Sequence, residues 1–375
     1  MADSIEITKS VARTFLLNYS MLGDKKETIE EVLRELSCIQ VDPLGTIARN
    51  HELALYNRVK NFRASLLQEK LYSERSLFEY WLQLYSIIPV EYFPYFRQRM
   101  EHRVTWHDEF EKEHRNEIVS AIDYIMQNGP SSSRDLAHIK TRQKLFSWNS
   151  AGQRTAILEY LWDTGKVCVS YRDKNRKYFD IPERVVPKEI YNKRATQQES
   201  IEFLINAAFS YTPILSRSQF HKVSRLGYAK NDVYKKRFDE LIDEGKITKL
   251  KIEKSTKQYY MRKDDLQHLT DGSSLSTHEA EEITTILSPL DPFIIDRGLI
   301  QDVFDFSYLW EAYVPLVKRK FDHYGMPVLH AGRFVGQIAV RREDKQLKIV
   351  KSTVTQKYLV RCIERELLRM REIKD

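Results

Sequence analysis

Gln40 and Asp42 form a pair of polar side chains that could do chemistry, because only Val41 separates them. Residues two positions apart in an extended segment point to the same side. A carboxylate, which only accepts hydrogen bonds, placed beside a neutral amide can hold and polarise a water molecule. The pair therefore predicts a site for hydrolysis without a metal ion. The spacing also allows a plain structural role, since Asp42 precedes Pro43 and Asp-Pro commonly starts a turn.

Other catalytic constellations are missing from the sequence. It has no HExxH, no P-loop, no GxGxxG and no GxSxG motif. His102, His107 and His114 cluster, but their offsets do not place all three on one helical face at ligand spacing. The three cysteines are widely spaced and form no CxxC pair, so we expect buried small side chains rather than disulfides or a zinc site. We expect no metal and no small-molecule cofactor.

The charge of the chain points to a polyanionic partner. The 375 residues carry a net charge of +7, and in residues 134–194 cations outnumber carboxylates two to one. A second basic segment covers residues 230–263, and a localised basic stripe suits a nucleic acid. A lysine-rich solvated surface is the alternative. With no run of about 18 apolar residues and no signal-peptide core at the N-terminus, we expect a cytoplasmic protein without membrane contact.

A repeated order of elements accompanies the basic segments. Apolar spacing predicts helices over residues 116–128, 134–139 and 152–163, followed by two extended runs around the turn 172–176. About 80 residues later the same order returns, with helices over 198–209, 216–223 and 231–244 and extended runs around the turn 254–257. Two further helices are expected at residues 8–19 and 28–38. The pattern is typical of tandem winged helices, which in other proteins also serve as protein-binding or architectural modules.

Five blocks of sequence resemble the AlkZ/YcaQ family of bacterial DNA glycosylases. In chain order they are CIQVDPLGTIARNHELALYNR, FEYWLQLYSIIPVEYFPYFRQRM, GPSSSRDL, ILEYLWDTGKVCVSYRDKNRKYFDIPERVVP and LSPLDPFIIDRGLIQDVFDFSYLWEAYVPLVKRKF. The resemblance runs from about residue 8 to residue 345 and keeps the family's order of blocks. One short block would be weak support for the resemblance, whereas five in register are strong.

The resemblance implies an α+β fold in which tandem winged-helix domains form a channel, with a small C-terminal β-barrel. On this basis we expect an N-terminal domain over residues 1–115, winged helices over 116–194 and 195–269, and a barrel with a terminal helix over 279–375. Short extended runs and turn signals after residue 278 suit such a barrel. The aromatic segment 81–96 could stack bases, but its mostly apolar sequence favours core packing.

The implied activity is removal of alkylated purines from double-stranded DNA. The family motif, glutamine, an apolar residue and then glutamine or aspartate, falls on Gln40, Val41 and Asp42. Its aspartate form resembles the YcaQ-like branch, which implies excision of N7-alkylguanine and unhooking of interstrand crosslinks. The sequence departs from the family pattern at Pro43, where threonine is usual, and at Leu82 and Gln83, where one position often holds histidine. These departures put the loop geometry and the substrate range in doubt.

The chemistry suits the two side chains. Alkylation at N7 makes the purine a cationic leaving group, so no strong general acid is needed. Asp42 would stabilise the oxocarbenium character of the sugar and deprotonate the attacking water, which Gln40 would orient. Without an essential lysine nucleophile, the expected enzyme is monofunctional and leaves an abasic site.

We expect the protein to act as a monomer at the bacterial nucleoid. Ten further residues are candidates for DNA contact. They are Arg49, His51, Arg58, Lys174, Arg176, Lys177, Lys254, Lys257, Arg297 and Arg333. His51 could instead be a partly buried cap, and an ion pair with Asp291 is an alternative for Arg297 or Arg333. A non-enzymatic DNA-binding regulator is the second interpretation of the chain. A nuclease ranks last, because only Glu35 and Glu52 stand near Asp42.

Overall fold

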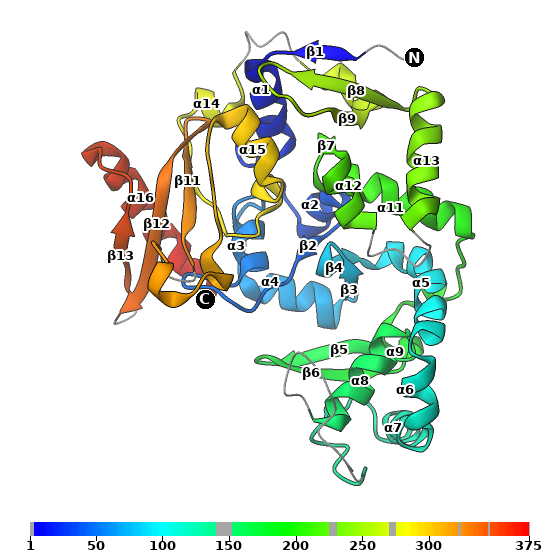
Figure 1. Ribbon diagram of the computed structural model, residues 1–375. Helices are drawn as coiled ribbons and strands as arrows, with labels where there is room; N and C mark the ends of the chain where they lie inside the picture. Colours follow the sequence, from blue (N-terminus) through cyan, green and yellow to red (C-terminus); the bar gives the residue numbers. More distant parts are fainter. Residues whose placement is uncertain are drawn as a thin grey trace.

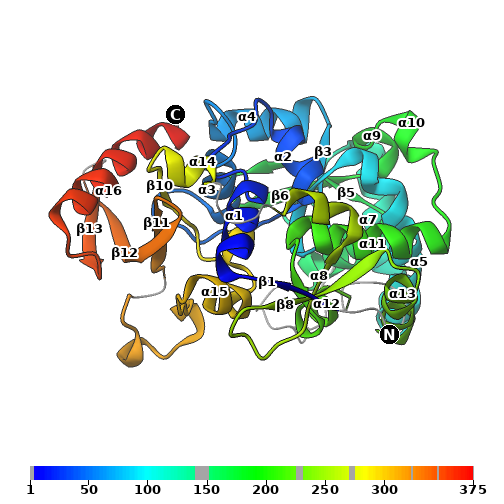
Figure 2. The same cartoon turned by 90° about the horizontal axis from the view of Figure 1, so that it is seen from above.

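The computed structural model describes residues 4–139, 152–224, 231–269, 275–321, 324–343 and 346–374. It is a mixed α+β structure of helices and several small sheets, as expected (Figure 1). The N-terminal elements lie between a C-terminal sheet on one side and two helix-and-hairpin units on the other (Figures 1 and 2). No helix in the described part of the chain is long and apolar enough to cross a membrane.

The first unit contains the Gln-x-Asp segment. Its helices and strands are α1 (Lys9–Tyr19), α2 (Ile29–Leu36), β2 (Ile39–Gln40), α3 (Asn50–Tyr56), α4 (Ala64–Gln68), β3 (Leu77–Leu82) and β4 (Leu84–Pro89). The helices expected at residues 8–19 and 28–38 are confirmed. Thr28 and Glu31 form a capping box that fixes the start of α2. Strands β2, β4 and β3 pair in that order, so the antiparallel hairpin β3–β4 supports the candidate motif.

The second unit ends in a two-stranded hairpin. Its elements are α5 (Phe93–Trp106), α6 (Asp108–Glu113), α7 (Arg115–Asn128), α8 (Gln153–Asp163), β5 (Cys168–Asp173), β6 (Arg176–Asp180), α9 (Pro182–Val185) and α10 (Lys188–Tyr191). The helix expected at residues 134–139 is wrong, because these residues form successive turns. There Asp135 accepts hydrogen bonds from the main-chain amide and the hydroxyl of Ser132. The basic linker after residue 139 lies mostly outside the described residues.

The third unit repeats the order of helices followed by a hairpin. It comprises α11 (Gln197–Tyr211), β7 (Leu215–Ser216), α12 (Arg217–Ser224), α13 (Asn231–Asp243), β8 (Ile247–Ile252) and β9 (Tyr259–Arg262). A capping box between Thr196 and Glu199 starts α11. Strand β1 (Ile5–Ile7) pairs in parallel with β8, which gives the sheet order β1-β8-β9-β7. The sequence pattern did not predict this strand.

The C-terminal region forms an open sheet, so the expected closed barrel is not found in the described residues. Its elements are α14 (Thr277–Ala280), β10 (Thr284–Ile286), α15 (Arg297–Phe304), β11 (Met326–His330), β12 (Arg333–Glu343), β13 (Gln346–Ser352) and α16 (Lys357–Arg369). Strands β10 to β13 pair in chain order, and β10 does not pair with β13. The expected terminal helix corresponds to α16 followed by a 3-10 turn.

Aromatic side chains dominate the core between the first and second units. Tyr80, Phe93, Phe96 and Trp162 are almost fully buried, with Tyr80 in edge-to-face contact with Phe96 and Trp162. This confirms that most of the segment 81–96 packs in the core. A second cluster joins α2 and α3 to the C-terminal sheet and α16. The sheet and the terminal helix therefore hold the Gln-x-Asp segment from one side.

Candidate active site

Gln40 lies at the end of β2 with its side chain in the interior. The residue is 5% exposed, and its Oε1 is buried with no hydrogen-bond partner among the described residues. Its main-chain carbonyl accepts a hydrogen bond from Asn50 Nδ2 at 2.9 Å, and Asn50 Oδ1 accepts one from the Leu290 amide at 3.2 Å. Asn50 thus fixes the main chain of Gln40, while the amide oxygen is left to accept a hydrogen bond. Unpaired buried polar atoms are rare and often functional.

Asp42 follows in a half-buried position on a tight turn. Its Oδ1 accepts a hydrogen bond from the Leu44 amide at 2.8 Å, so the residue does start a turn. Burial raises the pKa of the Asp42 carboxyl above 3.8, and the Leu44 hydrogen bond acts in the opposite direction. A Cβ atom on Gly45 would lie 1.9 Å from the carbonyl oxygen of Ala48. This close approach of two main-chain segments requires glycine and holds Asp42 at the start of the turn.

A tyrosine hydroxyl lies near Asp42. Tyr324 is 3% exposed, and its hydroxyl has no hydrogen-bond partner among the described residues. Burial raises the pKa of Tyr324, and the charges of Asp42 and Glu52 raise it further. Tyr324 therefore stays protonated and can donate a hydrogen bond. The structure thus places a neutral hydrogen-bond donor near Asp42.

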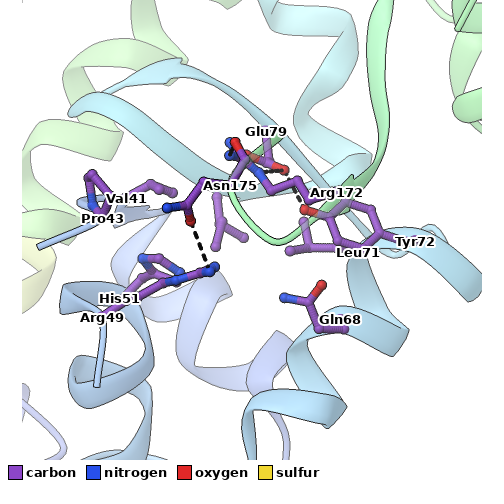
Figure 3. A pocket seen from close by; sticks show the side chains of 11 residues that line it. Val41, Pro43, Arg49, His51, Gln68, Leu71, Tyr72, Glu79, Arg172 and Asn175 are labelled. Atoms are coloured by element: carbon purple, nitrogen blue, oxygen red, sulfur yellow. Dashed lines mark hydrogen bonds and ion pairs between the residues drawn. The ribbon is translucent and has the colours of Figure 1, made fainter. Parts of the chain in front are cut away.

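A small pocket lies on the other side of the Gln40–Asp42 segment (Figure 3). Its lining residues are Val41, Pro43, Arg49, His51, Gln68, Leu71, Tyr72, Glu79, Ile87, Arg172 and Asn175. Gln40 and Asp42 do not line it, because alternate residues of an extended segment point to opposite sides. The pocket has a volume of about 30 Å³, enough for one or two water molecules but not for a purine.

A buried ion pair forms the far wall of this pocket. Arg172 Nη2 on β5 donates to Glu79 Oε2 on β3 at 2.5 Å, and the hydroxyls of Tyr72 and Tyr85 also donate to Glu79. Burial alone would raise the pKa of Glu79, but Arg172 and these hydrogen bonds lower it to about 2. Glu79 is therefore a fixed anion that joins the second hairpin to β3–β4 and is not a candidate general acid.

Arg49 and His51 close the near wall of the pocket. Arg49 Nη2 donates to Asn175 Oδ1 at 3.0 Å, which links the start of α3 to the turn between β5 and β6 (Figure 3). His51 is 4% exposed and, among the described residues, its Nδ1 has no hydrogen-bond partner. Burial, together with the nearby charge of Arg49, lowers the pKa of His51 to about 3. His51 is neutral at pH 7 and buried, but the N-cap of α3 is Arg49 rather than His51.

We expected Arg58 to contact DNA, and the structure contradicts this expectation. Its side chain is fully buried, and its guanidinium forms two hydrogen bonds with Asp291, at 2.9 and 2.7 Å. It also donates to the carbonyls of Ser20 and Ala54. Arg58 cannot reach a phosphate from this position. The ion pair considered for Asp291 exists, but with Arg58 rather than Arg297 or Arg333.

The other cations that we expected to contact DNA differ in whether they are exposed or already paired within the protein. Lys174, Lys254 and Arg333 are exposed at turns or strand ends, and Arg176 is partly exposed. Lys177 instead pairs with Glu159 at 3.0 Å and lies over the rings of Tyr85 and Trp162. Lys257 pairs with Asp302 at 3.2 Å. Arg297 lies over the ring of Tyr308.

Sequence reasoning missed the residues that surround the motif from other elements. Glu79, Tyr85 and Arg172 form one hydrogen-bonded cluster, although Arg172 is 93 positions from Glu79 and 87 from Tyr85. A charged residue inside the apolar run FEYWLQLYSII was the available signal, because a buried carboxylate requires a partner. Tyr324 carried no such signal. The described residues contain no group of three or more His, Cys, Asp or Glu placed to hold a metal ion.

Comparison with known proteins assigns the chain to a class. Residues 33–372 match the model of a family described as DNA glycosylase AlkZ-like. This match covers most of the chain, which therefore belongs to the AlkZ-like DNA glycosylase family. The structure is similar to that of the Streptomyces sahachiroi DNA glycosylase AlkZ, with a TM-score of 0.65 and 15% sequence identity, covering 100% of this chain and 98% of that one. At this identity the likeness establishes a shared fold.

Proposed function

We propose that the protein is a monofunctional DNA glycosylase that hydrolyses the N-glycosidic bond of N7-alkylated purines in double-stranded DNA. The observation that carries the proposal is the arrangement at β2. Among the described residues, the buried Oε1 of Gln40 has no hydrogen-bond partner, and it stands two residues before a half-buried carboxylate in a turn closed at Gly45. The family assignment makes DNA the partner.

In the proposed mechanism Asp42 acts as the base. At pH 7 its carboxylate is ionised even with a raised pKa, so it can attract the positive charge that develops on the sugar as the glycosidic bond breaks. It then accepts a proton from the attacking water, which the amide oxygen of Gln40 orients. The alkylated purine leaves as a neutral base, since it was cationic before cleavage. No covalent intermediate forms, and the product is an abasic site.

We extend the proposal to interstrand crosslinks at N7, because they contain the same cationic leaving group.

The repeated order of helices and hairpin supports winged helices over residues 116–194 and 195–269, with a related N-terminal domain over 1–115. The exposed Lys174 and Lys254 at the two hairpin turns would then contact DNA phosphates. Residues 279–375 would form the C-terminal domain, packed on the N-terminal domain through a shared buried cluster. The protein would act as a monomer at the bacterial nucleoid.

The test is base release from a duplex with a single N7-methylguanine, followed by alkaline cleavage at abasic sites. We expect strand breaks with the wild-type protein after alkali only, and a rate at least roughly 100-fold lower with Asp42→Asn. DNA affinity should stay within a few-fold. Asp24→Asn is the control, because Asp24 is an exposed carboxylate near the surface of the same unit. Tight DNA binding without breaks, here or with a nitrogen-mustard crosslink, would instead indicate a non-enzymatic DNA-binding protein.

A further inference from the structure

The segment between α15 and β11 exposes an unusual group of apolar side chains. Leu309, Tyr313, Leu316 and Val317 are 59%, 88%, 71% and 92% exposed. Tyr313 and Val317 are the two most exposed large hydrophobic residues in the described part of the chain. In Figure 2 this gold-to-orange segment stands away from the body of the molecule. We call residues 309–318 the apolar loop. Large apolar side chains exposed this strongly on one short segment are typical of an interaction surface.

The apolar loop is held in shape by its own hydrogen bonds. The Glu311 carboxylate accepts hydrogen bonds from the amides of Lys320 and Phe321 at 2.8 and 2.6 Å. Arg319 donates to the carbonyls of Val314 and Ala312 at 2.6 and 3.1 Å. The apolar side chains are thus presented by an ordered loop, so that binding a partner would cost little ordering entropy.

The lysines beside the apolar tip, and the position of the loop in the fold, indicate which kind of partner the loop binds. Lys318 and Lys320 are exposed beside the apolar tip, and a positive base below an apolar tip complements a duplex, with phosphates outside and stacked bases inside. At the base of the loop, the Tyr308 hydroxyl donates to the Gly325 carbonyl at 2.8 Å. The neighbouring Tyr324 belongs to the same buried cluster as Ile39 and Ile47, against which Val41 also packs. The base of the loop therefore adjoins the core cluster that also holds the segment around Asp42.

We propose that the apolar loop is a wedge that enters the DNA minor groove beside the damaged nucleotide and partly unstacks one base step. Tyr313 and Val317 contact the bases, while Lys318 and Lys320 contact the flanking phosphates. Other DNA-bending proteins insert apolar side chains between base steps in this way. The proposal rests on the proposed function for the position of the damaged nucleotide, but unstacking itself requires no turnover.

The test uses a duplex with 2-aminopurine beside an N7-methylguanine, in an Asp42→Asn background that prevents base release. Fluorescence of 2-aminopurine rises when the base unstacks. We expect a clear rise with the parent protein and loss of most of it when Tyr313→Ser and Val317→Ser are added. Leu275→Ser is the matched control, because Leu275 is 67% exposed and lies outside the loop. With Asp42 restored, the loop variant should release base about tenfold more slowly.

Three outcomes would overturn the proposal. One is a parent protein that binds DNA without any fluorescence change, and another is a loop variant that unstacks the duplex as well as its parent. The third is a DNA-free parent that sediments as a dimer and becomes monomeric with Val317→Ser, since the loop would then bind a second copy. If the protein lacks glycosylase activity, the fluorescence result still decides whether the loop is a wedge.

Discussion

Asp42 sets the expected pH dependence of activity. Burial raises its carboxyl pKa above 3.8, and only the ionised form can act as the base. The single-turnover rate should therefore fall on acidification at a pH higher than the ordinary aspartate value. The measurement is base release between about pH 4 and 8, corrected for spontaneous depurination. A rate that stays constant to the bottom of this range would remove Asp42 from the role of base.

Arg58 and Asp291 should matter for stability and not for DNA contact. Both side chains are fully buried and bonded to each other, so Arg58→Met leaves a buried carboxylate unpaired. We expect a loss of about 3–5 kcal/mol in the free energy of unfolding, measured in urea. Asp291→Asn should cost a similar amount, and the double variant less than the sum of the two. If Arg58→Met were as stable as the wild-type protein but bound DNA more weakly, Arg58 would contact DNA and the assignment to stability would be wrong.

At the scale of elements, the Glu79–Arg172 pair connects the hairpin β5–β6 to β3–β4. The folded-state pKa of Glu79 is about 2, below its usual 4.5, so between these values the unfolded chain binds more protons. The pair's contribution is fully present above pH 4.5 and is lost as the pH falls toward 2. Glu79→Gln should lower the melting temperature at pH 7 and weaken its dependence on pH below 4.5. Equal acid sensitivity in both proteins would contradict this assignment.

Local signals predicted the elements better than their partners. Helices α2 and α11 begin at capping boxes that can be read from three or four adjacent residues, and the turns at 172–176 and 254–257 separate paired strands as expected. The expected helix at 134–139 failed because Asp135 caps a turn with Ser132 instead. Strand β1 forms only because it pairs with the distant β8, and the C-terminal sheet is open because β10 and β13 do not pair. The spacing of apolar residues does not show which distant strands pair.

For the candidate site, too, the sequence predicted the residues with a local signal and missed those that come from distant segments. Gln40 and Asp42 follow from their spacing of two positions and from the family resemblance, whereas Glu79, Arg172 and Tyr324 join the region only when distant segments pack together. Arg58 was misassigned because sequence shows the charge of a residue but not its burial. The partner that allows its burial is 233 positions away.

At the scale of the whole molecule, the hairpin cations should determine the salt dependence of DNA binding. Lys174 is exposed at the tip of the turn, so Lys174→Glu should weaken binding to any sequence and reduce the salt slope by about one unit. Lys177→Glu serves as the comparison. It should mainly destabilise the fold, because Lys177 pairs with Glu159 over aromatic rings. Fluorescence anisotropy at several salt concentrations distinguishes the two. Equal slopes for Lys174→Glu and wild type would exclude a phosphate contact.

The parallel pairing of β1 with β8 has a consequence for synthesis on the ribosome. Ile5 lies opposite Leu250, so β1 must wait for nearly 250 further residues. At about 5–20 residues per second this delay is on the order of 10–50 s. During that time its edge stays unpaired, and Arg58 has no Asp291. We therefore expect the nascent chain to carry an open strand edge and a lone cation until its last third is translated.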